Sequence, residues 1–340
     1  GVCSMANTEP VSDNQGVIEF IQREAEKAGL ARVYPAGAVT KGLKGEEIAE
    51  HGELKKSGVA AISDDGRPIM NSDVMRRALE YAKMFDLMLI DHCEDLNLSS
   101  GGVMNEGYLS TVLGLKGIPE ESETIMVARD IELARLTSGK LHITHVSSAR
   151  SVELIRRAKR DGVKVSCDVT PHHLVLTEDA VRRFDTNAKM NPPLRGEKDM
   201  KALQAGLSDG TIDAVATDHA PHAGFEKEVE FDYAPFGVIG LQTSFSVVFT
   251  YMVEKGLITL SQLVERMSLS PAKLLGVRGG SISAGNEADI AILNPDEEWV
   301  VTKENLESGC KNSPFLGWKL KGLVTDVLVK GKIVLRDGKF

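Results

Sequence analysis

The feature that most constrains the fold is an alternation of short apolar runs and helix-like segments from residue 1 to about residue 220. Such alternation is typical of βα units whose parallel strands are buried. The runs lie at residues 2–6, 31–34, 59–62, 87–90, 141–144, 163–167 and 212–216. An open doubly wound sheet fits this pattern, but seven successive units favour an eight-stranded barrel that lacks one strand.

The missing strand is most easily placed before Gly1, so we expect a TIM-like (β/α)8 barrel without its first strand. Ser72 and Ser151 are predicted to cap two of its helices. After residue 240 the pattern changes to longer helices around 260–267 and 271–275, and then to strand-like segments at 288–293, 299–302, 324–329 and 333–335. The sequence therefore predicts a barrel over residues 1–285 and a small β-sheet subdomain over residues 286–340.

Composition narrows the class of function. The net charge of −9 and the pI near 5.5 argue against a nucleic-acid surface, and no apolar run approaches the roughly 18 residues of a membrane helix. The four cysteines are scattered without metal-binding spacing, which favours reduced thiols in a cytoplasmic protein. The first seven residues contain Met5 but do not begin with methionine, and they read as an interior strand rather than a signal peptide.

Polar residues follow the apolar runs at the places where a βα barrel carries its active site. Any one histidine is more often structural, but the recurrence at successive strand ends predicts that these side chains converge on one or two divalent ions, zinc above all. The residues are Asn7, Asp64, Asp65, Asp91, His92, His145, Asp168, His172, His173, Asp218, His219 and His222. His51 and His142 lie away from these positions and are given no function.

The residue types suggest the chemistry. Amide hydrolysis near neutral pH needs a strong nucleophile, which a divalent ion provides by lowering the pKa of bound water to about 7. A carboxylate must then carry the proton to the leaving nitrogen, and Asp218 is the candidate. No Gly-x-Ser-x-Gly elbow and no phosphate-binding glycine loop occurs in the sequence. We therefore expect a metal-dependent hydrolase acting on a small molecule.

At this point the sequence resembles a known family. The segments MANTEPVSD, SDDG, DHCED, ITHVSS, VTPHHL, KMNPPLR, ATDHAPH and APFGVIGL are similar, in order and spacing, to motifs of bacterial class I dihydroorotases. The resemblance implies reversible cyclisation of N-carbamoyl-L-aspartate to L-dihydroorotate in pyrimidine biosynthesis. It also implies a binuclear zinc centre and a metal-bound hydroxide as the nucleophile.

The resemblance assigns roles to individual residues. Asp65 would bridge two zinc ions, His92 and His145 would bind the second ion, and Asp218 would bind the first and shuttle the proton. The substrate contacts would come from Asn7, Asn191, His222, Phe236 and Gly237. A possible homodimer and an association with aspartate transcarbamoylase are further implications.

Two departures from the family pattern bear on activity. Ala6 replaces a proline, which should alter its loop only slightly. The family's His-x-His-Phe-Arg segment, which carries two ligands and a carboxylate-binding arginine, does not occur in this sequence. We therefore expect an amino-terminally truncated chain that by itself binds the second zinc weakly, binds the first hardly at all, and has little activity.

Three alternatives remain open. Hydantoinases and dihydropyrimidinases usually carry a carbamylated lysine at the bridging position, where this sequence has Asp65. An allantoinase shares the architecture. A non-catalytic partner of aspartate transcarbamoylase would be expected to lose metal ligands, whereas Asp65, His92, His145 and Asp218 are all present.

Overall fold

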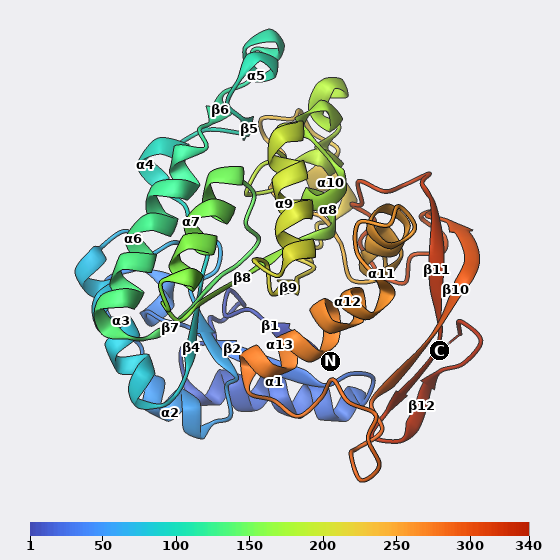
Figure 1. Cartoon of the computed structure of the whole chain (residues 1–340), viewed down its shortest axis with the longest axis horizontal. Helices are drawn as coiled ribbons and strands as arrows, with labels where there is room; N and C mark the ends of the chain where they lie inside the picture. Colours follow the sequence, from blue (N-terminus) through green and yellow to red (C-terminus); the bar gives the residue numbers. More distant parts are fainter. Residues whose placement is uncertain (340) are drawn as a thin grey trace.

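A seven-stranded parallel sheet forms the centre of the chain, which is described over residues 1–339 by a computed structural model (Figure 1). Its strands follow one another in chain order, and each contains part of one of the seven apolar runs. The strands are β1 (Val2–Ser4), β2 (Val33–Gly37), β3 (Ala61–Ser63), β4 (Met88–Asp91), β7 (Lys140–Ile143), β8 (Val165–Val169) and β9 (Ala214–Val215). The predicted parallel α/β architecture is confirmed.

Helices connect the strands and cover the outside of the sheet. Figure 1 shows α3, α6, α7 and α9 following one another along this outer layer. The helices before residue 210 are α1 (Gln15–Ala28), α2 (His51–Lys56), α3 (Ser72–Met84), α4 (Leu96–Ser99), α5 (Tyr108–Leu113), α6 (Glu121–Thr137), α7 (Ala149–Arg160), α8 (Pro171–Val175) and α9 (Glu197–Asp209). Their apolar faces pack on one face of the strands and form the main core, whereas Ala61, Met88 and Ile90 on the other face form a separate small cluster with Leu274 and Leu275. The sheet is thus buried on both sides, as a parallel sheet usually is.

Both predicted helix caps were wrong by a few residues. Asn71 caps α3, with its side-chain oxygen accepting from the amide of Asp73 at 2.9 Å. Ser148 caps α7 and accepts from the amide of Ser151 at 3.1 Å. In each case an equally good capping residue stands just before the predicted one, and the chain begins its helix at the earlier position.

A short arm projects beyond the carboxyl ends of the strands. It is built from β5 (Met104–Asn105), β6 (Gly117–Ile118) and α5, and α5 lies at its tip in Figure 1. The sequence did not predict this arm, because its two strands have only two residues each. Met104 and Leu109 of the arm belong to a buried cluster that also contains Met190 and Leu194 from the segment before α9. The arm therefore adjoins the mouth of the sheet.

The carboxyl-terminal part forms an antiparallel three-stranded sheet of β10 (Ile290–Val300), β11 (Lys319–Val329) and β12 (Lys332–Leu335). Two of the predicted strands, 288–293 and 299–302, are a single strand with a register shift between Asn294 and Glu298. The shift absorbs the proline and acidic residues that interrupt the apolar pattern.

This sheet packs on α11 (Ser244–Val248) and the π-helical turn Phe249–Val253. Gly322 of β11 has φ +86°, and an added Cβ there would come within 2.9 Å of the Phe245 ring. A glycine is required at this contact. The two helices predicted near 260–267 and 271–275 form one run, in which the π turn Glu265–Leu269 joins α12 (Leu260–Val264) to α13 (Ser270–Leu275).

Among residues 1–339, no helix combines the length and the apolar character needed to cross a membrane.

Candidate active site

Three side chains from three consecutive strand ends meet at the carboxyl end of the sheet. Asp65 follows β3, His92 follows β4 and His145 follows β7. His92 Nδ1 lies 2.9 Å from His145 Nε2, which lies 3.3 Å from Asp65 Oδ1, and His92 Nδ1 lies 3.8 Å from the same oxygen. The sequence placed these residues together, and the structure brings them together.

The cluster attracts positive charge. Burial disfavours the His145 cation, but the hydrogen bond from His145 to Asp65 and the charges of Asp218 and Asp65 outweigh burial and raise the pKa of His145 to about 9. Burial opposes ionisation of Asp65 as well, yet His145 and His92 hold its pKa below the ordinary value. His145 therefore holds a proton on Nε2, within hydrogen-bond distance of His92 Nδ1 and Asp65 Oδ1.

This geometry fits a metal ion in place of that proton. A tetrahedral zinc with ligand bonds of about 2.0–2.2 Å separates its ligand atoms by roughly 3.3–3.6 Å. Of the three separations in the cluster, 2.9 Å lies below this range, 3.3 Å lies at its lower end and 3.8 Å lies above it. Two imidazole nitrogens and one carboxylate oxygen also form a donor set that zinc prefers. A metal would displace this proton, as expected for such ligands.

Buried polar contacts fix the backbone that carries these ligands. Asp64 accepts hydrogen bonds from the amides of Val39 at 2.7 Å and Thr40 at 3.1 Å, and from the Thr40 hydroxyl. These bonds join the loop after β3 to the loop after β2. Burial raises the pKa of Asp64 to about 6, although each of these hydrogen bonds opposes the shift. The two adjacent aspartates therefore differ, since Asp64 anchors the loop and Asp65 faces the cluster.

His145 is anchored through Asp168 of β8. The Asp168 carboxylate accepts from the His145 amide at 2.6 Å, from the Thr144 hydroxyl at 3.0 Å and from the His142 ring at 2.9 Å. His145 itself has φ +40°, a conformation that a non-glycine residue adopts only when its surroundings enforce it. The hydrogen bonds of Asp168 to the His145 amide and the Thr144 hydroxyl stabilise this backbone conformation.

Asp218 follows β9 and also has a left-handed backbone, with φ +45°. Burial raises the pKa of Asp218, and the positive charge of His145 acts against this shift. Its carboxylate is outside the group of ligand atoms that lie within 4.8 Å of one another. Asp218 therefore lies close enough for the charge of the cluster to change its pKa, but its carboxylate is not within ligand distance of all three other groups.

The residues expected to bind substrate surround the cluster. The Asn7 side-chain amide donates to Asp65 Oδ2 at 3.4 Å, and the Asn191 amide donates to Glu94 at 2.9 Å. His222 lies on the segment after β9, and its Nε2 donates to the Phe236 carbonyl at 2.8 Å. These contacts place four of the predicted residues on three loops at one end of the sheet.

Gly237 completes the set of predicted substrate residues. It has φ +121°, and a Cβ added there would lie 2.6 Å from Ala220 Cβ and 3.1 Å from His222 Nε2. No larger residue fits between these two loops. A close approach of backbone to the neighbouring loop explains the glycine.

Sequence reasoning missed the side chains that hold these loops. Asn312, from the segment before β11, donates to the carbonyls of Ala220 and Gly237 and accepts from the His222 amide. Nothing in the local pattern distinguishes Asn312, because each of its partners lies 75 or more residues away in sequence.

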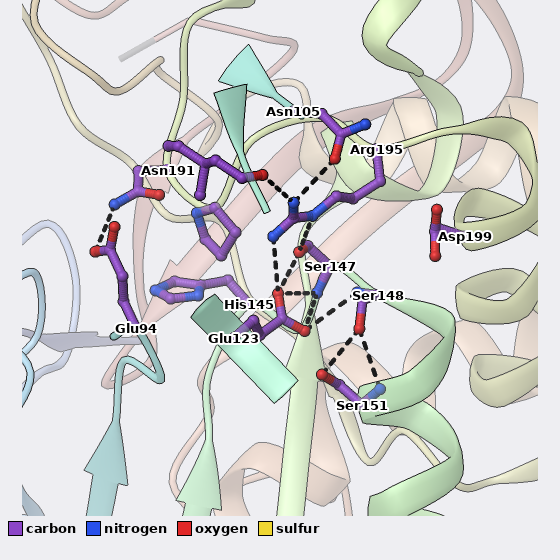
Figure 2. A network of polar contacts seen from close by, with 12 residues as sticks. Glu94, Asn105, Glu123, His145, Ser147, Ser148, Ser151, Asn191, Arg195 and Asp199 are labelled. Carbon is purple, nitrogen blue, oxygen red and sulfur yellow. Dashed lines mark hydrogen bonds and ion pairs between the residues drawn. The ribbon is translucent and has the colours of Figure 1, made fainter. Parts of the chain in front are cut away.

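A second missed group is the buried pair of Glu123 on α6 and Arg195 before α9 (Figure 2). Glu123 accepts from the amides of Ser147 and Ser148, just after His145, and from the Ser147 hydroxyl. Arg195 donates to the Ser147 hydroxyl at 3.1 Å and to Asn105 of the projecting arm at 2.9 Å. The pair ties the loop that carries His145 to the loop that carries Asn191.

Cys93 lies in a second cluster with Asp91 and Asp130, which the scattered spacing of the cysteines did not indicate. Its sulfur lies 3.1 Å from Asp91 Oδ2 and 3.7 Å from Asp130 Oδ2, and all three residues are buried. Burial raises the pKa of Cys93 and of Asp130 well above their ordinary values. Arg129 donates to Asp130 Oδ1 at 2.8 Å and so gives this carboxyl a cationic partner.

Of the other histidines at strand ends, His173 and His219 are held by hydrogen bonds, whereas His172 Nε2 is buried without a hydrogen-bond partner among residues 1–339. His173 is bonded to the Thr170 hydroxyl at 2.7 Å and to the Pro192 carbonyl at 3.0 Å. His219 Nδ1 accepts from the Gly240 amide at 3.1 Å. His172 stacks near His173, and burial lowers its pKa well below the ordinary value. These rings stabilise the loops and do not enter the cluster of Asp65, His92 and His145.

A hollow of about 460 Å³ adjoins the cluster and is lined by Glu94, Asn191 and Phe236, among others. A larger hollow of about 530 Å³ lies at the amino ends of the strands, beside Arg32 and Val33. We assign the chemistry to the smaller one, because active sites of βα barrels lie at the carboxyl ends of the strands.

Comparison with known proteins agrees with this site. A family model described as "Dihydro-orotase-like" matches residues 1–151. The dihydroorotase of Acetivibrio thermocellus is 53% identical over 336 residues, which cover 99% of this chain and 79% of the relative. The dihydroorotase of Caldanaerobacter subterraneus is also 53% identical, over 99% of this chain and 78% of the relative. The chain belongs to the dihydroorotase family. The resemblance noted in the sequence is thereby confirmed, and the protein is a cyclic amidohydrolase of a metal-dependent family.

Solved structures support the fold of this dihydroorotase-family chain. An L-hydantoinase from Arthrobacter aurescens superimposes with a TM-score of 0.87 at 24% identity, covering 99% of this chain and 77% of that one. A dihydropyrimidinase from Brevibacillus agri gives 0.82 at 23% identity, covering 99% and 76%. At these identities the likeness bears on the barrel architecture alone.

Proposed function

We propose that this chain carries the catalytic machinery of a dihydroorotase, which interconverts N-carbamoyl-L-aspartate and L-dihydroorotate. The observation that carries the proposal is the convergence of Asp65, His92 and His145 beside a hollow lined by Asn191. Relatives that are more than half identical over nearly the whole chain bear the same name.

Zinc is the cation that we propose for the cluster, with Asp65, His92 and His145 as ligands and Asp218 completing the family arrangement. When bound, the ion would act as a Lewis acid on the scissile ring amide. Asp218 would move the proton to the leaving nitrogen, a role for which a carboxylate whose pKa is raised by burial is suited. In the family pattern Asp65 would bridge a second zinc ion.

Substrate recognition is assigned to the surrounding loops. Asn7, Asn191 and His222 offer amide and imidazole groups that hydrogen-bond to a ring amide and a carboxylate. The backbone at Phe236 and Gly237 lies against His222 and would hold one edge of the ring. These contacts would orient an anionic ring over the cluster.

The test is an activity assay with a matched control. Because the sequence contains no His-x-His, the chain is assayed alone and with a His-x-His-Phe-Arg segment of a relative joined ahead of Gly1, with zinc present. We expect loss of dihydroorotate absorbance in the extended form, little in the chain alone, and none in extended Asp218→Asn. Turnover no greater than that of the Asp218→Asn control would refute the proposal.

A substrate panel separates the alternatives. We expect dihydroorotate to be preferred over allantoin, hydantoin and dihydrouracil, because Asp65 stands where hydantoinases usually carry a carbamylated lysine. Preference for a neutral ring would support a hydantoinase. Binding of aspartate transcarbamoylase without turnover of any substrate in the extended form would support a non-catalytic partner.

We also propose a division into a barrel over residues 1–285 and a β subdomain over residues 286–340. The antiparallel pairing of β10, β11 and β12 with one another, and not with the parallel sheet, supports it. A cytoplasmic location is proposed as well, because all four cysteines are free. Homodimer formation, which light scattering would measure, remains a proposal from the family resemblance.

A further inference from the structure

Glu94 connects a proposed metal ligand to a proposed substrate ligand. It lies two residues after His92 and is buried, with 8% of its surface exposed. One oxygen, Oε2, accepts from His92 Nε2 at 2.9 Å and from the Asn191 side-chain amide at 2.9 Å. Figure 2 shows the Asn191 amide turned toward this carboxylate. Two loops far apart in sequence therefore share a single acceptor atom.

The contact determines which nitrogen of His92 faces the cluster. An ionised carboxylate only accepts hydrogen bonds, so the proton of the neutral His92 ring lies on Nε2. Nδ1 is then left with its lone pair, and this atom is directed at His145 Nε2 and Asp65 Oδ1. A neutral imidazole binds a cation only through the nitrogen that carries no proton. Among residues 1–339, Glu94 is the only hydrogen-bond partner of Nε2, so its removal would leave the ring free to adopt the other tautomer.

The same contact orients Asn191. Within residues 1–339, the Asn191 side chain makes no hydrogen bond other than the one to Glu94. The second N–H and the carbonyl oxygen of its amide are therefore free for a ligand in the adjoining hollow. Because a carboxylate cannot donate, the bond also specifies that the nitrogen, and not the oxygen, of the amide points at Glu94.

We propose that Glu94 is a positioning residue that serves both ends of the active site, holding His92 for the metal and Asn191 for the substrate. The identity of those two ligands rests on the proposed function. Since one carboxylate anchors both, its loss should weaken both metal binding and substrate binding.

The test compares three variants of the chain. Glu94→Ala removes the shared acceptor. Glu94→Gln keeps an acceptor oxygen of similar size but removes the charge. Asp95→Asn is the control, since it removes a carboxylate one residue away and preserves an N-cap side chain for α4, where Asp95 accepts from the Asn97 amide at 2.9 Å.

Zinc affinity is measured by competition with a chromogenic chelator, and the His92 tautomer by nitrogen-15 NMR of the metal-free chain. We expect zinc affinity to fall about 10- to 100-fold in Glu94→Ala, about fivefold in Glu94→Gln and less than about twofold in Asp95→Asn. The protonated nitrogen should be Nε2 in the wild type and in Glu94→Gln, and a mixture of both nitrogens in Glu94→Ala.

The substrate end is read separately, in the extended form at saturating zinc. There, Glu94→Ala should raise KM for dihydroorotate more than it lowers kcat, because Asn191 loses its orientation while the metal is restored.

Undiminished zinc affinity with an unchanged tautomer in Glu94→Ala would overturn the inference, whatever the activity. Absence of dihydroorotate turnover in the wild type would instead refute the proposed function and leave the metal and NMR readings to decide on Glu94. If Glu94→Ala does not fold, Glu94→Gln decides, and zinc affinity equal to wild type would then count against the inference.

Discussion

Replacing Glu123 by alanine removes the carboxylate that anchors the loop after β7. Its oxygens lie 3.2 Å from the amide nitrogens of Ser147 and Ser148, and its side chain is buried, with 3% of the residue exposed. Each of the two buried amides that loses its acceptor should lower the free energy of unfolding by about 1–3 kcal/mol. Arg195 would keep its bonds to Ser147, Asn105 and the Ile118 carbonyl, so its charge stays partly compensated. We expect a loss of about 4 kcal/mol in the free energy of unfolding, within the range for breaking a buried pair.

Urea denaturation followed by circular dichroism measures this loss, and Glu121→Ala is the matched control. Glu121 lies in the same first turn of α6 but is exposed, where it pairs with exposed Arg150 at 3.1 Å. Its replacement should change the free energy of unfolding by less than about 1 kcal/mol. If Glu123→Ala and Glu121→Ala were equally stable, the buried carboxylate would not be what holds this loop.

Two further outcomes test the burial of specific groups. Burial lowers the pKa of His173 from 6.5 to about 4, so between these pH values the unfolded chain binds more protons than the folded chain. The free energy of unfolding should therefore fall by up to about 3 kcal/mol as the pH drops from 6.5 to 4. His173→Asn should flatten this pH dependence, and parallel plots of unfolding free energy against pH for the two proteins would contradict the assignment. Native thiol titration should label Cys310 first, because burial raises the pKa of Cys3 to about 12 and also raises those of Cys93 and Cys167. Rapid labelling of Cys93 would refute this order.

The sequence predicted the parallel sheet because a strand buried on both faces needs a continuous apolar run, and each run belongs to one strand. The same logic failed for β5 and β6, which are too short to form such a run. It also failed along β10, where Pro295 and the acidic residues after it suggested an interruption that the strand absorbs as an irregularity in pairing.

The cluster of Asp65, His92 and His145 could be anticipated for a topological reason. Residues that directly follow parallel strands meet at one end of the sheet, so position along the chain determines position in space. The structure brings these three together, whereas Asp91, at an equivalent strand end, turns toward Cys93 and Asp130. The direction of a side chain depends on its packing, which a strand-end rule does not describe.

Supporting residues could not be found in this way. Glu94, Glu123, Arg195 and Asn312 act through contacts with loops that are distant in sequence. Each is polar and buried only because of those contacts, and isolated from them each has the appearance of a surface residue. Side chains that orient a site can therefore be identified from their contacts in the structure, but not from the sequence pattern alone.

The central claim is that Asp65, His92 and His145 bind one divalent cation. Anomalous X-ray diffraction at the zinc edge, from crystals grown with zinc, tests it most directly. The claim predicts a peak about 2.0–2.2 Å from His92 Nδ1, His145 Nε2 and an Asp65 carboxylate oxygen, and no peak there in His145→Ala crystals. Zinc bound elsewhere, or His92 facing the ion through Nε2, would contradict the account.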